Sequence, residues 1–287
     1  MSTTPTAPAG SGTLTLGHSP DPDDAFMFHG MLSGKVPCGE IRFEQVIEGI
    51  EALNREAIAG QVDFTAASVH AMGVIGGSYQ ILDSGAAMGD GYGPVLVARE
   101  PIDLRQLQET QVAVPGILTT AYLALRLAAG SFPFKVVPFD EVLGDVEAGH
   151  SGAALVIHEG QVTYEKQGFH KILDLGEWWK EKTGLPLPLG VNIVKASLGA
   201  GTIREIGTAL KASIQYAFDH RDEAITHALE YGRGIDRATT DRFVGMYVNE
   251  WTLSMGAPGR KAIELLLGEG REKGLIPDKP GPVFAEV

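Results

Sequence analysis

The chain has 287 residues, of which 44% are hydrophobic and 21% charged, a balance typical of globular proteins and not of disordered ones. This length suffices for two domains, and 36 acidic against 23 basic residues give a net charge of −13, which argues against nucleic acid or an anionic membrane surface as a partner. A single cysteine, Cys38, excludes an internal disulfide and a cysteine-based metal site.

The first 13 residues differ in composition from the rest of the chain. They are rich in Ser, Thr, Pro, Gly and Ala, with no basic residue and no apolar core. We therefore expect a disordered leader at 1–13 and not a secretory signal. No later stretch approaches the roughly 20 apolar residues that a membrane span requires. The sequence thus predicts a soluble, cytoplasmic protein.

After the leader, short strand-like runs alternate with helical patterns. Strands are predicted at 13–19, 40–47, 62–68, 79–87, 93–100, 111–116, 134–139 and 152–159. Helices are predicted between them at 21–34, 49–60, 69–77, 119–130 and 140–149. From about Ile203 onward the pattern is helical, and 277–284 is expected to be an irregular tail. Strands that alternate with helices of about 10 to 15 residues predict an α/β protein with parallel sheets.

Two segments of the chain echo each other, 56–68 and 145–158. Each runs from a helix end through Ala-Gly and a short linker into an apolar strand with a polar end. The echo predicts two similar α/β lobes, with Ser68 and His158 at equivalent strand ends. Because ligands of open α/β sheets bind beyond the carboxyl ends of the strands, two facing lobes would enclose a central cleft between these two residues.

Three predicted strand ends lead into helices through small polar residues, at 17–28, 64–72 and 114–125. Free backbone N–H groups and the helix dipole make such junctions suitable for anions. The hydroxyl groups that would add hydrogen bonds there belong to Ser19, Ser68, Thr119 and Thr120. Plain N-capping uses the same residue types and explains any one junction better. Three junctions in one cleft favour a small acidic ligand.

Two further patterns near the predicted cleft have both a functional and a structural explanation. Asp21, Asp23 and Asp24 share one turn, but the later ligands of a calcium loop are missing, so helix initiation is favoured over a metal site. Asp24 is kept as a candidate substrate-binding residue. The Gly-rich stretch 89–94 lacks the lysine and the helix of a phosphate loop, so we expect a turn that places Gly93 near the cleft.

Histidine spacing gives no metal or protease motif, and the chain contains no GxSxG, GxGxxG or P-loop. His158 directly follows the apolar run 153–157, so it would emerge where a buried strand reaches the cleft. Imidazole titrates near neutrality, which suits proton abstraction. From spacing alone, a hydrogen-bonded structural histidine remains the favoured interpretation. His18 and His70 are second-rank candidates near other strand ends.

The chain resembles the 1,4-dihydroxy-6-naphthoate synthases of the futalosine route to menaquinone, from about Leu14 to the C-terminal region. The stretches that carry the resemblance are "SPDPDDAF", "GYGPVLVAR", "VAVPG" with "TTAY", "IHE", "DLGEWW", "TGLPLPLG" and "YVN". Of these, "TGLPLPLG" and "IHE" are the most specific, whereas the SP.P.D turn is shared with the chorismate dehydratases of the sister branch. The chain departs from the family at "SPDPDD", at Leu118 and at "IHEG".

The resemblance implies a two-lobed type II periplasmic-binding-protein-like fold with a central cleft and C-terminal helices. Lobe one would comprise 14–97 and 196–287, and lobe two 98–195. It also implies a lyase that cleaves cyclic dehypoxanthine futalosine to 1,4-dihydroxy-6-naphthoate and a dihydroxyacetone-type fragment. His158 would match the catalytic base, and Ser68, Thr119 and Thr120 the hydroxyl ligands of a small acidic aromatic substrate. No metal or cofactor is implied.

Two alternatives stay open: a small-acid-binding protein without catalysis, and a chorismate dehydratase. The fold is shared with transport receptors, and a fold alone does not decide function. The sequence also leaves open whether the protein is a monomer or a dimer.

Overall fold

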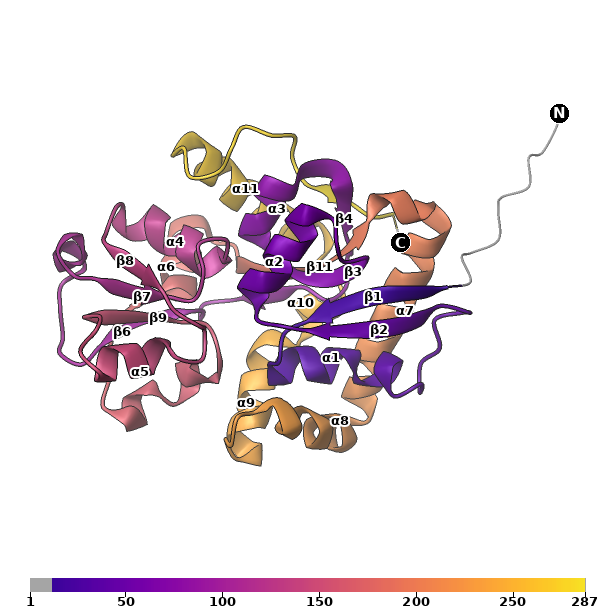
Figure 1. Ribbon diagram of the computed structural model, residues 1–287, viewed down its shortest axis with the longest axis horizontal. Coiled ribbons are helices and arrows are strands. Elements are labelled where there is room, and N and C mark those ends of the chain that lie inside the picture. The colour runs from indigo at the N-terminus through magenta and orange to yellow at the C-terminus, as the bar shows by residue number, and fades with distance from the viewer. Residues whose placement is uncertain (1–11, 287) are drawn as a thin grey trace.

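The computed structural model describes residues 12–286 and shows the predicted α/β class, in two lobes (Figure 1). Most of the predicted leader, residues 1–11, lies outside the described part, and Thr13 already begins the first strand. No helix within 12–286 is long and apolar enough to cross a membrane.

The first lobe is built on a sheet with the strand order β12-β4-β11-β3-β1-β2, and β5 also pairs with β11. Its strands are β1 Thr13–His18, β2 Arg42–Ile47, β3 Phe64–Ser68, β4 Tyr79–Ile81, β5 Ala87–Gly89, β11 Leu187–Lys195 and β12 Val283–Phe284. β1 runs parallel to β2 and β3, but β11 runs antiparallel to β3, β4 and β5. The sheet is therefore mixed and not purely parallel as predicted, because the chain returns from the second lobe through β11.

The second lobe has the strand order β10-β6-β9-β7-β8. Its strands are β6 Val95–Ala98, β7 Val112–Val114, β8 Phe134–Val136, β9 Ala153–Val156 and β10 His170–Asp174. β6 pairs with β9 and β10 in this sheet, although the predicted boundary after residue 97 assigns most of β6 to the first lobe. Residues 187–195, which were assigned to lobe two, form β11 and pair in the first sheet. The chain thus changes sheets between β5 and β6 and again before β11.

Helices cover both sheets and continue as a C-terminal group beside α1 (Figure 1). They are α1 Pro22–Leu32, α2 Ile50–Ala59, α3 Val69–Ile75, α4 Thr120–Ala129, α5 Val142–Glu147, α6 Leu175–Thr183, α7 Gly199–Asp219, α8 Arg221–Ala228, α9 Arg237–Tyr247, α10 Glu250–Leu253 and α11 Gly256–Glu272. Sequence patterns did not predict β10, α6 or β11. The expected irregular tail contributes β12, which pairs with β4.

Local signals explain how the helices near the cleft begin and end. α1 starts with Pro22 and has Asp23 and Asp24 in its first turn, where a fixed φ and negative charge favour a helix N-terminus. The Ala-Gly pairs of the two echoing segments end α2 and α5, with Gly60 at φ 69° and Gly149 at φ 73°. Both glycines thus adopt a positive φ, which carries no steric penalty without a Cβ and is common just after a helix.

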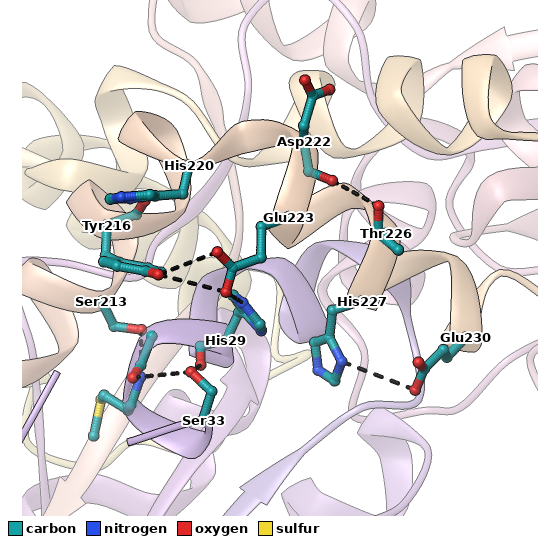
Figure 2. A network of polar contacts seen from close by, with 12 residues as sticks. His29, Ser33, Ser213, Tyr216, His220, Asp222, Glu223, Thr226, His227 and Glu230 are labelled. Atoms are coloured by element: carbon teal, nitrogen blue, oxygen red, sulfur yellow. Dashed lines mark hydrogen bonds and ion pairs between the residues drawn. The ribbon is translucent and has the colours of Figure 1, made fainter. Parts of the chain in front are cut away.

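A polar network joins α1 to α7 and α8 (Figure 2). The Ser213 hydroxyl donates to the Met27 carbonyl at 2.7 Å and accepts from the Met31 N–H at 3.1 Å. His29 Nε2 lies 3.0 Å from Glu223 Oε1. These bonds fix α1, which carries the SPDPDD turn, against the C-terminal helices.

Candidate active site

A cavity lies between the two lobes and is lined by residues from both of them. The first lobe contributes the end of β3, the start of α1, part of β11 and Tyr247 of α9. The second contributes the loop before α4 and the residues that follow β9. Of the predicted site residues, the cavity brings together Ser19, Asp24, Ser68, Thr119 and Thr120.

His158 follows β9 and is only 6% exposed, between two cavity-lining residues, Ile157 and Gln161, although it is not itself part of the lining. Its Nδ1 atom is buried and has no hydrogen-bond partner among the described residues. The ring packs edge-on against Phe139, with 6.0 Å between the ring centroids. A buried nitrogen without a partner is uncommon in a purely structural histidine.

His18 and His70 differ from His158, because ring nitrogens of both lie within hydrogen-bond distance of other protein groups. His18 Nδ1 lies 2.9 Å from the Ser19 carbonyl oxygen and its Nε2 lies 3.2 Å from Gln45 Oε1. His70 Nδ1 lies 3.2 Å from the Thr119 carbonyl oxygen. The structural interpretation therefore holds for these two histidines, and His158 differs from both.

Burial lowers the pKa of His158, while the charges of Glu159 and Asp21 oppose this shift. The imidazole is consequently neutral near pH 7 and able to accept a proton. Gly160 leaves room for it: a Cβ at this position would lie 2.8 Å from His158 Cε1 and 2.9 Å from Val156 Cγ1. Gly160, the glycine after "HE", therefore leaves the space that the imidazole ring of His158 occupies.

Arg233 joins the two lobes beside His158 and was not predicted from the sequence. Its guanidinium binds both carboxylate oxygens of Glu159, at 2.9 and 2.5 Å, and Oδ1 of Asp21 at 2.6 Å. It also lies over the Phe139 ring, 4.9 Å from the centroid. Arg233 has φ 48°, an uncommon conformation for a non-glycine residue. Glu159 is therefore engaged by Arg233, and Phe139 contacts both Arg233 and His158.

Ser68 ends β3 and is held by Asn54 of α2, which is fully buried and was also missed by sequence reasoning. The Ser68 N–H donates to Asn54 Oδ1 at 2.8 Å, and Asn54 Nδ2 donates to Ser68 Oγ at 3.0 Å. With Oγ acting as an acceptor towards Asn54, the hydroxyl hydrogen of Ser68 remains for a ligand.

The two threonines of the predicted site use their hydroxyls within the protein. Thr119 caps α4, accepting from the Tyr122 N–H at 3.2 Å and donating to the Gly116 carbonyl at 2.9 Å. Thr120 donates to the Leu189 carbonyl at 2.6 Å and accepts from the His70 N–H at 3.1 Å. The capping interpretation is confirmed for Thr119. Contact of either hydroxyl with substrate stays a prediction.

The SPDPDD turn forms one wall of the cavity through Ser19 and its aspartates. The Ser19 N–H donates to Asp24 Oδ2 at 2.7 Å, and the Ser19 hydroxyl donates to Asp21 Oδ2 at 2.9 Å. Burial raises the pKa of Asp24, and burial together with the neighbouring carboxylates raises that of Asp23 well above its usual value. Both carboxyl groups therefore favour the protonated form, and this wall is polar but, among the described residues, offers no cationic side chain to a ligand carboxylate.

Gly93 is not part of the cavity lining, although the next residue, Pro94, is. A Cβ on Gly93 would lie 2.8 Å from the Gly176 nitrogen. The glycine thus permits close packing of two backbones at the start of α6.

A family model and a named relative both match most of the chain. A family model described as menaquinone biosynthesis matches residues 14–272. A 1,4-dihydroxy-6-naphthoate synthase of Thermus thermophilus is 39% identical over 271 residues, which cover 94% of this chain and 98% of that protein.

Two solved structures are also similar to this chain. A protein of Archaeoglobus fulgidus is 43% identical with a TM-score of 0.88, over 92% of this chain and 98% of that one. The periplasmic aliphatic sulphonate binding protein of Escherichia coli is 12% identical with a TM-score of 0.64, over 98% and 95% of the chains. This last likeness shows the fold alone, which is that of the periplasmic binding proteins.

Proposed function

Because the chain belongs to the menaquinone-biosynthesis family, we propose that it is a carbon–carbon lyase that converts cyclic dehypoxanthine futalosine to 1,4-dihydroxy-6-naphthoate. The observation that carries the proposal is His158: a neutral, buried imidazole with an unpartnered nitrogen beside a cavity between two lobes. A binding protein would need no such base.

The substrate carboxylate would bind where α4 begins. Thr120 and Ala121, the first residues of α4, line the cavity, and backbone N–H groups in the first turn of a helix have no partner within the helix. The Ser68 hydroxyl adds a donor on the facing lobe. The SPDPDD wall disfavours the opposite orientation, because the carboxylate would face the carboxyl groups of Asp23 and Asp24 and no cationic side chain of the described cavity lining.

His158 would accept the proton from the carbon next to the substrate carbonyl. In a retro-aldol-like step the carbon–carbon bond to the dihydroxyacetone-type fragment then breaks: a hydroxyl of the fragment loses its proton and becomes the fragment's carbonyl. The electrons of the broken bond pass into the ring, and the ring carbonyl oxygen takes up a proton as the ring becomes aromatic. Aromatisation draws the cleavage forward. The charge of Glu159, which is held by Arg233, favours the protonated form of His158 and so stabilises the imidazolium ion formed during the reaction.

The test is incubation of the purified protein with cyclic dehypoxanthine futalosine, wild type beside His158→Ala, with naphthoate followed by chromatography and mass spectrometry. We expect product from the wild type and a loss of about a thousandfold in kcat for the variant, with substrate affinity changed less than about threefold. Equal rates would exclude His158 as the base. Tight binding without product would favour a binding protein, and turnover of chorismate instead would favour the sister branch.

A further inference from the structure

Gln161 has a buried side-chain amide that is hydrogen-bonded at one end only. The Tyr247 hydroxyl donates to its Oε1 atom at 2.5 Å, whereas its Nε2 atom is buried and has no partner in the described part of the chain. Gln161 is only 7% exposed and lines the cavity. Buried donors without an acceptor are rare in folded proteins, so this N–H group indicates a missing ligand atom.

Asn192 of β11 provides the complementary group. Its Nδ2 atom donates to the Gly85 carbonyl at 2.9 Å, which fixes the orientation of the amide. Its Oδ1 atom is buried without a partner within 12–286, and the residue, 1% exposed, also lines the cavity. One cavity therefore contains both an unused buried donor and an unused buried acceptor.

A hydroxyl group donates and accepts at once, so a ligand that carries hydroxyls can satisfy both amides. A carboxylate only accepts, and it would leave Asn192 Oδ1 unpaired and facing a negative group. This part of the cavity is suited to neutral, polyhydroxylated chemistry.

We propose that Gln161 and Asn192 form a subsite for the hydroxyl groups of the fragment that the substrate loses, and so orient its carboxylate toward the N-terminus of α4. This inference rests on the proposed function, which supplies a substrate with an acidic aromatic end and a polyhydroxylated end. Both amides are specificity-determining residues, and neither takes part in proton transfer.

Gln161→Glu is the sharpest test, because it keeps the acceptor for the Tyr247 hydroxyl and replaces the free N–H donor by an oxygen. Gln161→Met removes the amide without adding charge. Gln167→Glu is the matched control, since Gln167 is exposed and donates only to Thr163 in the described structure. KM and kcat are measured with the full substrate. Calorimetry gives the Kd of 1,4-dihydroxy-6-naphthoate, which has the carboxylate but lacks the polyhydroxylated fragment.

We expect KM to rise at least about tenfold in both Gln161 variants, because a buried hydrogen bond to a substrate hydroxyl is lost. The Kd of the naphthoate should change less than about threefold, and Gln167→Glu should match the wild type. Equal weakening of substrate and naphthoate, or an unchanged KM, would overturn the subsite. A wild type that neither binds nor converts the substrate would refute the proposed function, and the subsite with it.

Discussion

Replacing Arg233 by Met should destabilise the protein and alter His158 at the same time. The Glu159 side chain is 6% exposed and that of Asp21 is 16% exposed, so both carboxylates would lose a buried cationic partner. Removing one member of a buried pair costs roughly 3–5 kcal/mol, and the 27% exposure of Arg233 reduces this toward about 2–3 kcal/mol. Urea or thermal denaturation measures the loss.

The same substitution should shift the pH dependence of catalysis. In the wild type, burial lowers the pKa of His158 from its usual 6.5, so the acid limb of kcat/KM should lie below pH 6.5. The charge of Arg233 contributes to this lowering, whereas Glu159 and Asp21 act against it. Without Arg233 the pKa of His158 therefore rises, and the acid limb should move to higher pH.

Two further variants distinguish the loss of the Arg233 ion pairs from a general loss of structure. The double variant Glu159→Gln/Arg233→Met leaves fewer buried carboxylates unpaired, so it should be more stable than Arg233→Met alone. Arg237→Met is the control, because Arg237 pairs with the exposed Asp222 and should change stability by less than about 0.5 kcal/mol. An Arg233→Met protein with wild-type stability and an unmoved acid limb would refute the reasoning.

Two more variants test local features. Gly160→Ala places a Cβ 2.8 Å from His158 Cε1, so the imidazole must move, and kcat should fall about ten- to a hundredfold with near-normal folding. Gly144→Ala is the control, because the added carbon has open space around it. Equal activity of the two variants would show that Gly160 is dispensable. His227 has its pKa lowered by burial and by the charge of His29. Its neutral form is thus favoured by folding, and stability should fall as pH drops below about 6.5. His227→Gln should flatten the Tm between pH 7 and 5, and an unchanged slope would contradict this assignment.

Local pattern was enough to predict much of the framework. Alternating apolar runs predicted β1, β3, β7 and β9, and the Ala-Gly pairs predicted the ends of α2 and α5. These features depend on residues within a few positions of each other. The same short-range patterns predicted that His158 lies at a strand end and that the polar junctions surround one cleft.

Tertiary structure decided how those pieces are used. The predicted return to lobe one after residue 195 comes one strand too late, because the partners of β11, β3 and β4, lie more than a hundred residues earlier in the chain. Arg233 meets Glu159 from 74 positions away, and Asn54 holds Ser68 from a neighbouring helix. Whether a polar side chain is free or occupied depends on such distant partners. The sequence therefore determined that Ser19, Ser68, Thr119 and Thr120 reach the cleft. Only the packing of the two lobes left His158 Nδ1 and Gln161 Nε2 without a partner among the described residues, while it engaged the hydroxyls of Thr119 and Thr120.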